Sequence, residues 1–126
     1  MLLAVLEGVA FALRDCIEIA KNQGIRIHRS TICGGGAKSK LWQQIIADVL
    51  NVELSTVAVE EGPGYGAAML AAVACGEYAD IGECVKHTVR QMDKMKPEPE
   101  TAARYDMQYR KYRQIYPALR GFFSLD

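Results

Sequence analysis

Net charge is what this sequence most obviously lacks, since its 126 residues carry 15 Lys and Arg against 15 Asp and Glu. Without an excess of either sign, the composition predicts neither a nucleic-acid-binding protein nor one held on an anionic membrane by charge. Basic residues do gather near the end of the chain. Tyrosines and Asp106 interrupt them, which favours a solvated helix face. They are Arg104, Arg110, Lys111, Arg113 and Arg120.

Long apolar runs, a signal peptide and paired metal ligands are missing as well. Glu7, Arg14 and Asp15 break the first apolar stretch too early for a membrane span, and the N-terminus has no signal-peptide pattern. The two histidines stand apart, and the cysteines show no C-x-x-C spacing, so neither a metal site nor a disulfide framework is predicted. We expect a cytoplasmic protein with four free, buried thiols. These are Cys16, Cys33, Cys75 and Cys84.

Hydrophobic periodicity predicts an alternation of helices and strands. In the first helix the apolar stripe runs through Leu2, Val9 and Leu13. The expected helices cover residues 2–23, 38–51, 67–75, 81–86 and 100–119, and the expected strands cover 25–33 and 52–59. Gly24 and Gly76 are expected to close their helices, and Asp80 to cap the fourth.

Three stretches have weaker signals. Residues 62–66 are interpreted as a tight turn, and residues 87–96 as extended chain. Pro117 is expected to distort or end the last helix. Buried residues of the second helix are expected to include Leu41 and Trp42.

This order of elements predicts an α/β fold in which helices cover a sheet. The length suits one domain or part of one. Two strands make a poor sheet, so the chain is expected either to pair with a partner or to belong to something larger. Its opening directly on an amphipathic helix favours the second alternative.

The most informative motif runs from Thr31 to Trp42, where a strand leads into three consecutive glycines and then a helix. Glycine has no Cβ, so the backbone can approach a ligand closely, and the helix N-terminus attracts anions. Three adjacent glycines are more than one turn requires, which favours a nucleotide-binding corner. A P-loop is excluded, because that pattern needs glycine where Ile32 and Ala37 stand.

A second glycine motif, Gly62-x-Gly64-x-x-Ala67, fits the dinucleotide-binding pattern and follows a predicted strand. That fold also needs a second strand ending in an acid about 20 residues later. Asp80 and Glu83 occur there, but in a stretch read as turn and helix. We therefore favour a structural corner and keep dinucleotide binding as the alternative.

Four segments together resemble the C-terminal part of the FGGY carbohydrate kinases, and within that family the xylulokinases most closely. They occur in the family's order and cover nearly the whole chain. The last, Tyr-Arg-x-x-Tyr-Pro-Ala-Leu, favours the xylulokinases. The segments are residues 6–15, 34–48, 61–71 and 112–119.

The resemblance implies a ribonuclease H-like, actin-like ATPase fold with two lobes. Residues 1–126 would be a partial C-terminal domain from the second, ATP-binding lobe. It also implies phosphorylation of D-xylulose to D-xylulose 5-phosphate by ATP, with Mg²⁺ bridging the phosphates. Glycerol, ribulose or a deoxysugar is the alternative substrate. The sugar-binding lobe and the general-base aspartate would lie upstream, so we assign no catalytic residue and expect the isolated chain to be inactive.

Cofactor-binding residues also follow from the resemblance. Residues matching Gly34, Gly35, Gly36 and Ala37 line the adenosine and α-phosphate pocket of the family, and those matching Ser39 and Lys40 lie near the adenine or ribose. No magnesium ligand is expected in this segment. Residues 62–66 would begin a helix of the hinge region.

Four acidic residues are given structural roles, in capping or in hydrogen bonding inside the lobe. They are Glu7, Asp15, Asp48 and Glu61. A different class of function stays open, namely a non-catalytic interaction module with the same fold. Such a module would assemble, for example as a homodimer, through the tyrosine-rich helix at residues 100–119.

Overall fold

The computed structural model of the chain describes residues 2–58 and 62–123. Within these ranges lie five α-helices, one 3₁₀ helix (η1) and three strands. Their order is α1 (Leu2–Asn22), β1 (Arg29–Thr31), η1 (Gly35–Lys38), α2 (Lys40–Leu50), β2 (Glu53–Val57), α3 (Gly62–Ala74), α4 (Ile81–Thr88), β3 (Gln91–Met95) and α5 (Pro99–Phe123). The expectations for Val59 and Glu61 lie outside the described residues.

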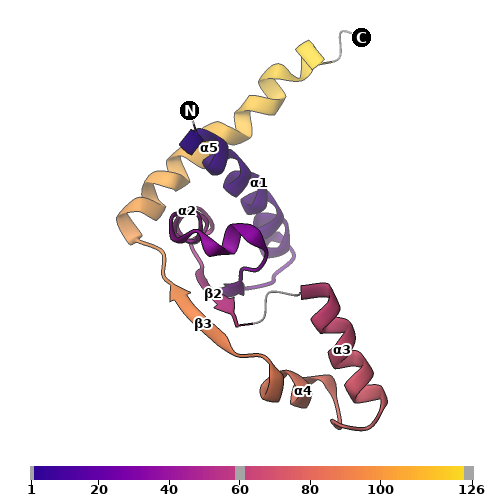
Figure 1. The fold of residues 1–126 in the computed structure, drawn as a ribbon. Helices are drawn as coiled ribbons and strands as arrows, with labels where there is room; N and C mark the ends of the chain where they lie inside the picture. Colours follow the sequence, from indigo (N-terminus) through magenta and orange to yellow (C-terminus); the bar gives the residue numbers. More distant parts are fainter. Residues whose placement is uncertain (1, 59–61, 124–126) are drawn as a thin grey trace.

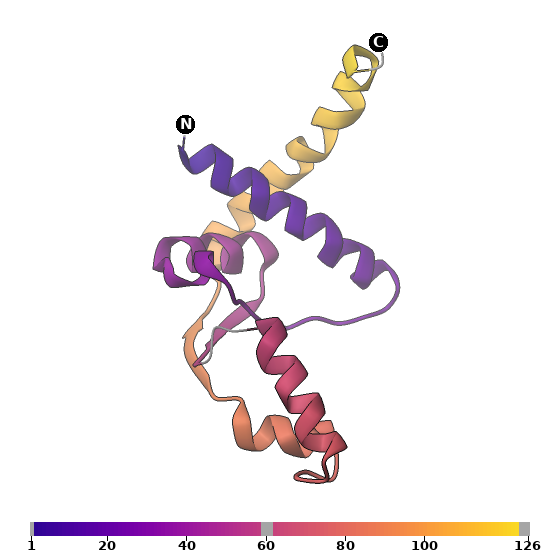
Figure 2. The ribbon, with the colours of Figure 1, turned by 45° about the vertical axis from the view of Figure 1, so that its right-hand side comes forward.

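A three-stranded sheet in the order β1-β2-β3 lies between the group formed by α1, α2 and α5 and the pair formed by α3 and α4 (Figure 1). β1 and β2 are parallel, whereas β2 and β3 are antiparallel. Helix α2 connects the parallel pair and packs against both α1 and α5. Helices α3 and α4 pack on each other at the far end of the molecule, away from that three-helix group (Figure 2).

The hydrophobic core forms around α2. Ile45, Ile46, Val49 and Leu50 are buried along one side of this helix, and the core continues into α1, β2 and α5. Local signals set the helix ends: the Ser39 Oγ accepts a hydrogen bond from the Trp42 N–H (3.3 Å) as the N-cap. The helix is thus held at the end that faces the glycines.

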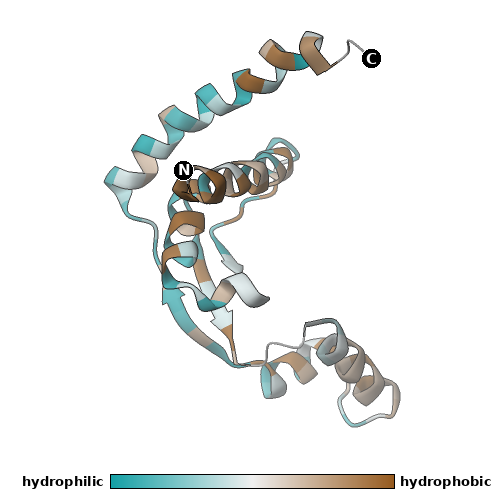
Figure 3. Cartoon of the chain, turned by 45° about the horizontal axis from the view of Figure 1, so that its top comes forward, coloured by the Kyte–Doolittle hydropathy of each residue, from teal (hydrophilic) through white to brown (hydrophobic). Residues whose placement is uncertain are grey.

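Apolar stripes were only partly predicted. On α1 the buried residues are Ala10, Phe11 and Arg14, whereas Leu2 and Leu13 of the expected stripe are exposed. Leu41 is also exposed and Trp42 only half-buried, so their expected burial in α2 is wrong. Figure 3 shows hydrophobic residues along α1 and at the C-terminal end of α5. These faces have no covering element within the described part of the chain.

Several element boundaries differ from expectation. β1 has three residues instead of nine, and α2 begins at Lys40. Helix α3 already begins at Gly62, so the turn expected at residues 62–66 is wrong, whereas the helix start that the family resemblance implied there is confirmed. A proline in the first helical turn loses no intrahelical hydrogen bond, which explains why Pro63 permits this early start.

Other features were placed correctly. Gly24 (φ +84°) and Gly76 (φ +81°) follow their helices in the left-handed region. Asp80 caps α4 by accepting a hydrogen bond from the Glu83 N–H (2.8 Å). Helix α5 continues through Pro117 to Phe123, beyond the expected bounds of 100–119, so of the two effects expected of this proline an end of the helix is wrong. The proline ring is accommodated on an exposed part of the helix.

The cysteines are all free, as expected, but three of the four are exposed. Only Cys84 is buried, where α4 packs against α3. Cys16, Cys33 and Cys75 lie in apolar stretches of the sequence, but no element of the described chain packs over them. The expectation of four buried thiols is therefore wrong.

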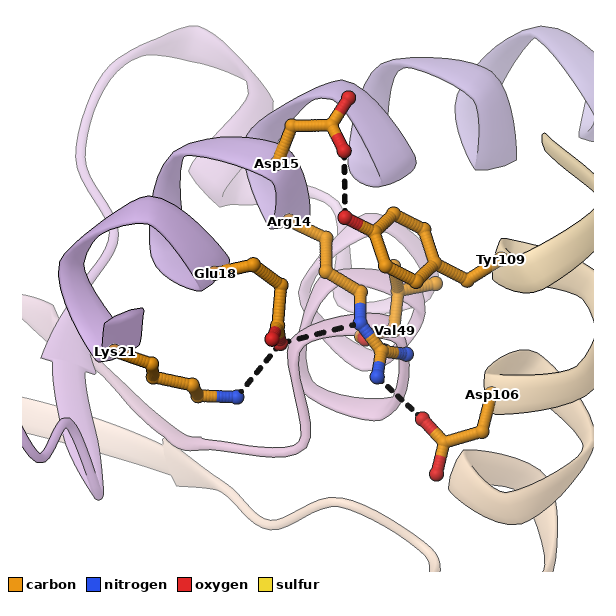
Figure 4. A network of polar contacts seen from close by, with 7 residues as sticks. All are labelled: Arg14, Asp15, Glu18, Lys21, Val49, Asp106 and Tyr109. Atoms are coloured by element: carbon orange, nitrogen blue, oxygen red, sulfur yellow. Dashed lines mark hydrogen bonds and ion pairs between the residues drawn. The ribbon is translucent and has the colours of Figure 1, made fainter. Parts of the chain in front are cut away.

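Arg14 connects the three helices of the core (Figure 4). Its Nη1 donates to the Val49 carbonyl of α2 (3.0 Å), and its Nη2 forms an ion pair with Asp106 of α5. The guanidinium carbon lies 4.4 Å from the centroid of the Tyr109 ring. Glu18 lies near the Arg14 Nε (3.7 Å) and also contacts Lys21. The buried charge of Arg14 thus has a polar partner on each of the helices α1, α2 and α5.

Two tyrosines add a second set of contacts between α1 and α5. The Tyr105 hydroxyl donates to the Glu7 carboxylate (2.9 Å), and the Tyr109 hydroxyl donates to the Asp15 carboxylate (2.5 Å). The structural roles predicted for these two carboxylates are confirmed. Burial, and next the hydrogen bond to the carboxylate, raise the pKa of both tyrosines from 10.0 to about 12.

We expect stability to fall at high pH because of these tyrosines. The unfolded chain loses their protons near an ordinary pKa of 10.0, whereas the folded chain keeps them until about 12. Deprotonation therefore favours unfolding, and the contribution present below pH 10 is lost as the pH rises toward 12. Urea midpoints between about pH 9 and pH 11 measure the slope. The Tyr105→Phe/Tyr109→Phe variant should show a flatter decline, and an equal decline would contradict the assignment.

Candidate functional site

The glycine turn, residues 34–39, connects the end of β1 to the start of α2. Gly34 has φ +87° and ψ +177°, a conformation open almost solely to glycine. The Ala37 N–H donates to the Gly34 carbonyl (2.9 Å), and the Ser39 N–H donates to the Gly36 carbonyl (3.1 Å). In such a 3₁₀ turn the first N–H groups, those of Gly35 and Gly36, have no acceptor within the turn.

Space around the three glycines is unequal. A Cβ added to Gly34 or Gly35 would meet no atom within 4 Å. A Cβ at Gly36 would lie 2.9 Å from Cδ1 and Nε1 of the Trp42 ring. Gly34 is therefore required by its backbone conformation and Gly36 by the close approach of the indole.

A cleft of about 260 Å³ opens beside this turn. The turn and the start of α2 form one wall, and β2 and β3 form the other. Of the residues expected to bind nucleotide, Gly34, Ala37 and Lys40 line it. The complete lining is Ile32, Cys33, Gly34, Ala37, Lys38, Lys40, Gln43, Thr56, Val57, Ala58, Met92 and Asp93.

Opposite charges meet at this cleft. The Lys40 Nζ forms an ion pair with the Asp93 carboxylate of β3, and both side chains are exposed. Lys38 adds a second cationic residue to the lining. Asp93 was missed by sequence reasoning, because nothing in residues 87–96 indicated a functional side chain. Antiparallel pairing of β3 with β2 brings it to the cleft.

The remaining expected site residues lie beside the cleft without lining it. Gly35 and Gly36 form the body of the 3₁₀ turn, and the Ser39 side chain caps α2. Asp48 is buried and accepts hydrogen bonds from the Glu98 N–H (2.7 Å) and from Gln44 Nε2 (2.8 Å). Its predicted structural role is confirmed.

The dinucleotide interpretation of residues 62–67 is wrong. Its glycines lie inside α3, and the next element is α4 instead of a strand. Asp80 caps α4, and the Glu83 carboxylate accepts a hydrogen bond from the Ala79 N–H (2.8 Å), so neither acid ends a strand. The motif is a helix start with small residues.

A larger groove of about 570 Å³ lies between α1 and the second half of α5. Its walls are mostly aromatic and aliphatic, and include Tyr112, Tyr116 and Phe123, with Asp15, Glu18 and Arg113 among the polar residues. This groove has no glycine turn and no helix N-terminus. Nucleotide chemistry therefore fits the smaller cleft better.

Across residues 2–58 and 62–123, no three His, Cys, Asp or Glu side chains come together as a metal site would require. None of the helices described is both long and apolar enough to cross a membrane.

Both the sequence and the fold of this chain match those of known proteins. The model of the FGGY family of carbohydrate kinases, C-terminal domain, matches residues 1–75. A xylulose kinase of Staphylococcus epidermidis is 38% identical over 113 residues, which are 90% of this chain and 23% of that protein. The crystal structure of xylulose kinase from Rhodospirillum rubrum matches with a TM-score of 0.82 and 34% identity, over 95% of this chain and 24% of the other. Gluconate kinase from Lactobacillus acidophilus gives a TM-score of 0.86 at 30% identity, over 96% and 25%.

The fold is thus the C-terminal part of the actin-like ATPase fold found in sugar kinases. The chain belongs to the FGGY family of carbohydrate kinases, and the family resemblance predicted from four segments is confirmed. It spans about a quarter of the length of these relatives. The roles of the residues at the glycine turn stay a prediction.

Proposed function

We propose that this chain is the C-terminal nucleotide-binding segment of an ATP-dependent sugar kinase, a partial domain that covers residues 1–126. The observation that carries the proposal is the glycine turn, which joins a strand to a helix N-terminus beside a cleft with two lysines. Helix N-termini and successive backbone N–H groups bind phosphate. Family membership supports a nucleotide as the source of that phosphate.

The residues present fit part of a nucleotide. Gly35 and Gly36 supply N–H groups without acceptors inside the turn. At Gly34 and Gly35 the space next to the backbone is open. A cleft of about 260 Å³ is small beside the roughly 300–1,000 Å³ of most ligand sites, so other parts of the longer protein would enclose the remainder.

The contribution of this chain to phosphoryl transfer is positioning. ATP, when bound, supplies the transferable phosphoryl group, and such reactions depend mainly on alignment and charge stabilisation. Lys40, paired with Asp93, places a cation at the cleft and compensates this carboxylate, which would otherwise repel phosphate. In this proposal the general base and the magnesium ligands belong to other parts of the longer protein, and the isolated chain transfers no phosphate.

D-xylulose is the substrate we propose for the longer protein, because xylulose kinases are among its relatives in both sequence and structure. A ribulokinase at 38% identity and the gluconate kinase structure define the alternatives. Phosphorylation assays of the longer protein with D-xylulose, ribulose, gluconate and glycerol distinguish these substrates. A preference for any sugar other than D-xylulose would overturn this part of the proposal.

Nucleotide binding is tested by amide NMR of the chain titrated with Mg·ADP. We expect saturable shifts at Gly34, Gly35 and Gly36 and at the start of α2, with the α3–α4 pair as an internal control. Phosphate-free adenosine serves as the ligand control. A folded chain that shows no saturable shift at the turn would contradict the proposal.

A second candidate function, that of an interaction module, rests on the groove between α1 and α5. Five residues near the end of α5 are large, apolar and exposed: Ile115, Tyr116, Leu119, Phe122 and Phe123. Aromatic residues of this kind are enriched in protein interfaces. A second copy of the chain offers the same apolar surface. Sedimentation that depends on chain concentration, in a chain that does not bind Mg·ADP, would favour this function over the first.

A further inference from the structure

Two adjacent side chains of α2 contact the glycine turn. The Gln43 Nε2 donates a hydrogen bond to the Ala37 carbonyl at the middle of η1. The Trp42 ring lies against Gly36, so closely that no Cβ fits there without movement. Both contacts reach back from the first turn of α2 to the segment that precedes it.

Gln43 is unusual because it is polar, belongs to a core helix and is only 3% exposed. Burying an amide is unfavourable unless it is hydrogen-bonded. Its side chain bonds to the turn, and its backbone N–H donates to the Ser39 carbonyl (2.9 Å). One buried residue is thus attached to η1 through its side chain and to Ser39, which lies between η1 and α2, through its backbone.

The turn needs such attachment for a physical reason. Three consecutive glycines have more accessible backbone conformations than any other tripeptide, and freezing them is costly. A phosphate site built from backbone N–H groups works best when these groups are already oriented before the ligand arrives. The backbone bonds of a 3₁₀ turn, such as those donated by the Ala37 and Ser39 N–H groups, have poorer geometry than those of an α-helix, so contacts from outside the turn matter for its order.

We propose that Gln43 and Trp42 are positioning residues that hold the glycine turn in its binding conformation. This inference deepens the proposed nucleotide function and rests on it. Gln43 fixes the Ala37 carbonyl and thereby the direction of the neighbouring peptide groups. Trp42 fills the space beside Gly36, which makes glycine the residue required at that position.

The test uses the whole 126-residue chain and the variant Gln43→Met, which keeps side-chain length and burial but removes the amide donor. Gln44→Met is the matched control, because Gln44 is the next residue of α2 and bonds away from the turn, to the Lys96 carbonyl (3.1 Å) and to Asp48. Amide hydrogen exchange at Ala37 and Ser39 and the affinity for Mg·ADP are both measured. Urea unfolding confirms that each variant is folded.

Gln43→Met should speed exchange at these two amides about tenfold and weaken Mg·ADP about tenfold, whereas Gln44→Met should do neither. Unchanged exchange would overturn the inference. Faster exchange with unchanged Mg·ADP affinity would overturn the positioning role as well, because the contact would then be only structural.

Failure of the proposed function is distinguishable from failure of this inference. A wild-type chain that does not bind Mg·ADP would contradict the proposed function, whereas hydrogen exchange alone still decides whether Gln43 orders the turn. If Gln43→Met does not fold, Trp42→Phe replaces it, since the smaller ring loosens the contact at Gly36 while the chain keeps an aromatic residue. Exchange at Ser39, whose N–H donates to the Gly36 carbonyl, should then rise, and no rise would contradict the inference.

Discussion

Arg14→Ala is expected to lower the free energy of unfolding by about 3 kcal/mol, a large part of the stability of a small domain. The Arg14 side chain is buried, with 11% of its surface exposed. Its removal leaves the Val49 carbonyl without this donor and Asp106 without its cation, and it takes away the face-on contact with Tyr109. Partial exposure of Asp106 keeps the expected loss at the lower end for buried ion pairs.

Urea or thermal unfolding of the chain measures this loss. Lys21→Ala is the matched control, because Lys21 also pairs with Glu18 but is exposed, and its loss should be below about 0.5 kcal/mol. Arg14→Lys should recover only part of the stability, since an ammonium group cannot donate in two directions as a planar guanidinium does. Equal stabilities for Arg14→Ala and Lys21→Ala would show that the network does not hold α1, α2 and α5 together.

Local chemistry made α2 and the helix ends predictable. The apolar spacing of α2 from Ile45 to Leu50 matches its burial, and Gly24 and Gly76 adopt the left-handed conformation expected after a helix. These signals act within a few residues of chain. The predicted helix boundaries were wrong where two local signals competed. Ser39, for example, could belong to the helix or cap it, and in the structure it is the N-cap of α2.

Strand β3 was predicted only as part of an extended stretch at residues 87–96, and its pairing in the sheet could not be predicted in this way. Four of its five residues are exposed, so no alternating apolar pattern marks them. The strand exists because its backbone pairs with β2, with Leu54 opposite Met95 and Ser55 opposite Lys94. Pairing partners about 40 residues apart leave no local signal. The cleft wall that includes Asp93 was missed for the same reason.

The glycines of the candidate site could be predicted from the sequence, but the side chain that contacts them from α2 could not. Three consecutive glycines before a helix identify the turn, whatever the rest of the chain does. Gln43, by contrast, is a polar residue next to another glutamine, and in sequence it reads as part of an exposed face. Only the packed structure shows that it is buried against the Ala37 carbonyl. The buried face of α1 was misassigned because amphipathic periodicity identifies the apolar side of a helix but not the elements that pack against it.

Gly36→Val is expected to weaken Mg·ADP binding at least about tenfold and also to lower the free energy of unfolding by about 1–3 kcal/mol. The first atom added, Cβ, would lie 2.9 Å from two atoms of the Trp42 ring. Valine adds two further methyl groups, so either the indole or the turn must move. An effect on nucleotide binding alone, with the fold unchanged, is the weaker expectation, since Trp42 belongs to the packed start of α2.

Gly35→Ala separates the two effects of the Gly36 substitution. A Cβ at Gly35 meets no atom within 4 Å, and its φ is not in the positive range that penalises side chains. Stability should therefore change by less than about 0.5 kcal/mol, whereas a methyl group next to the N–H groups proposed to bind phosphate should still weaken Mg·ADP binding. Binding is followed by NMR titration and stability by urea unfolding of the same samples. If Gly35→Ala and Gly36→Val both left Mg·ADP binding unchanged, the glycine turn would have a structural role only, with Gly34 required by its backbone conformation and Gly36 by the Trp42 ring.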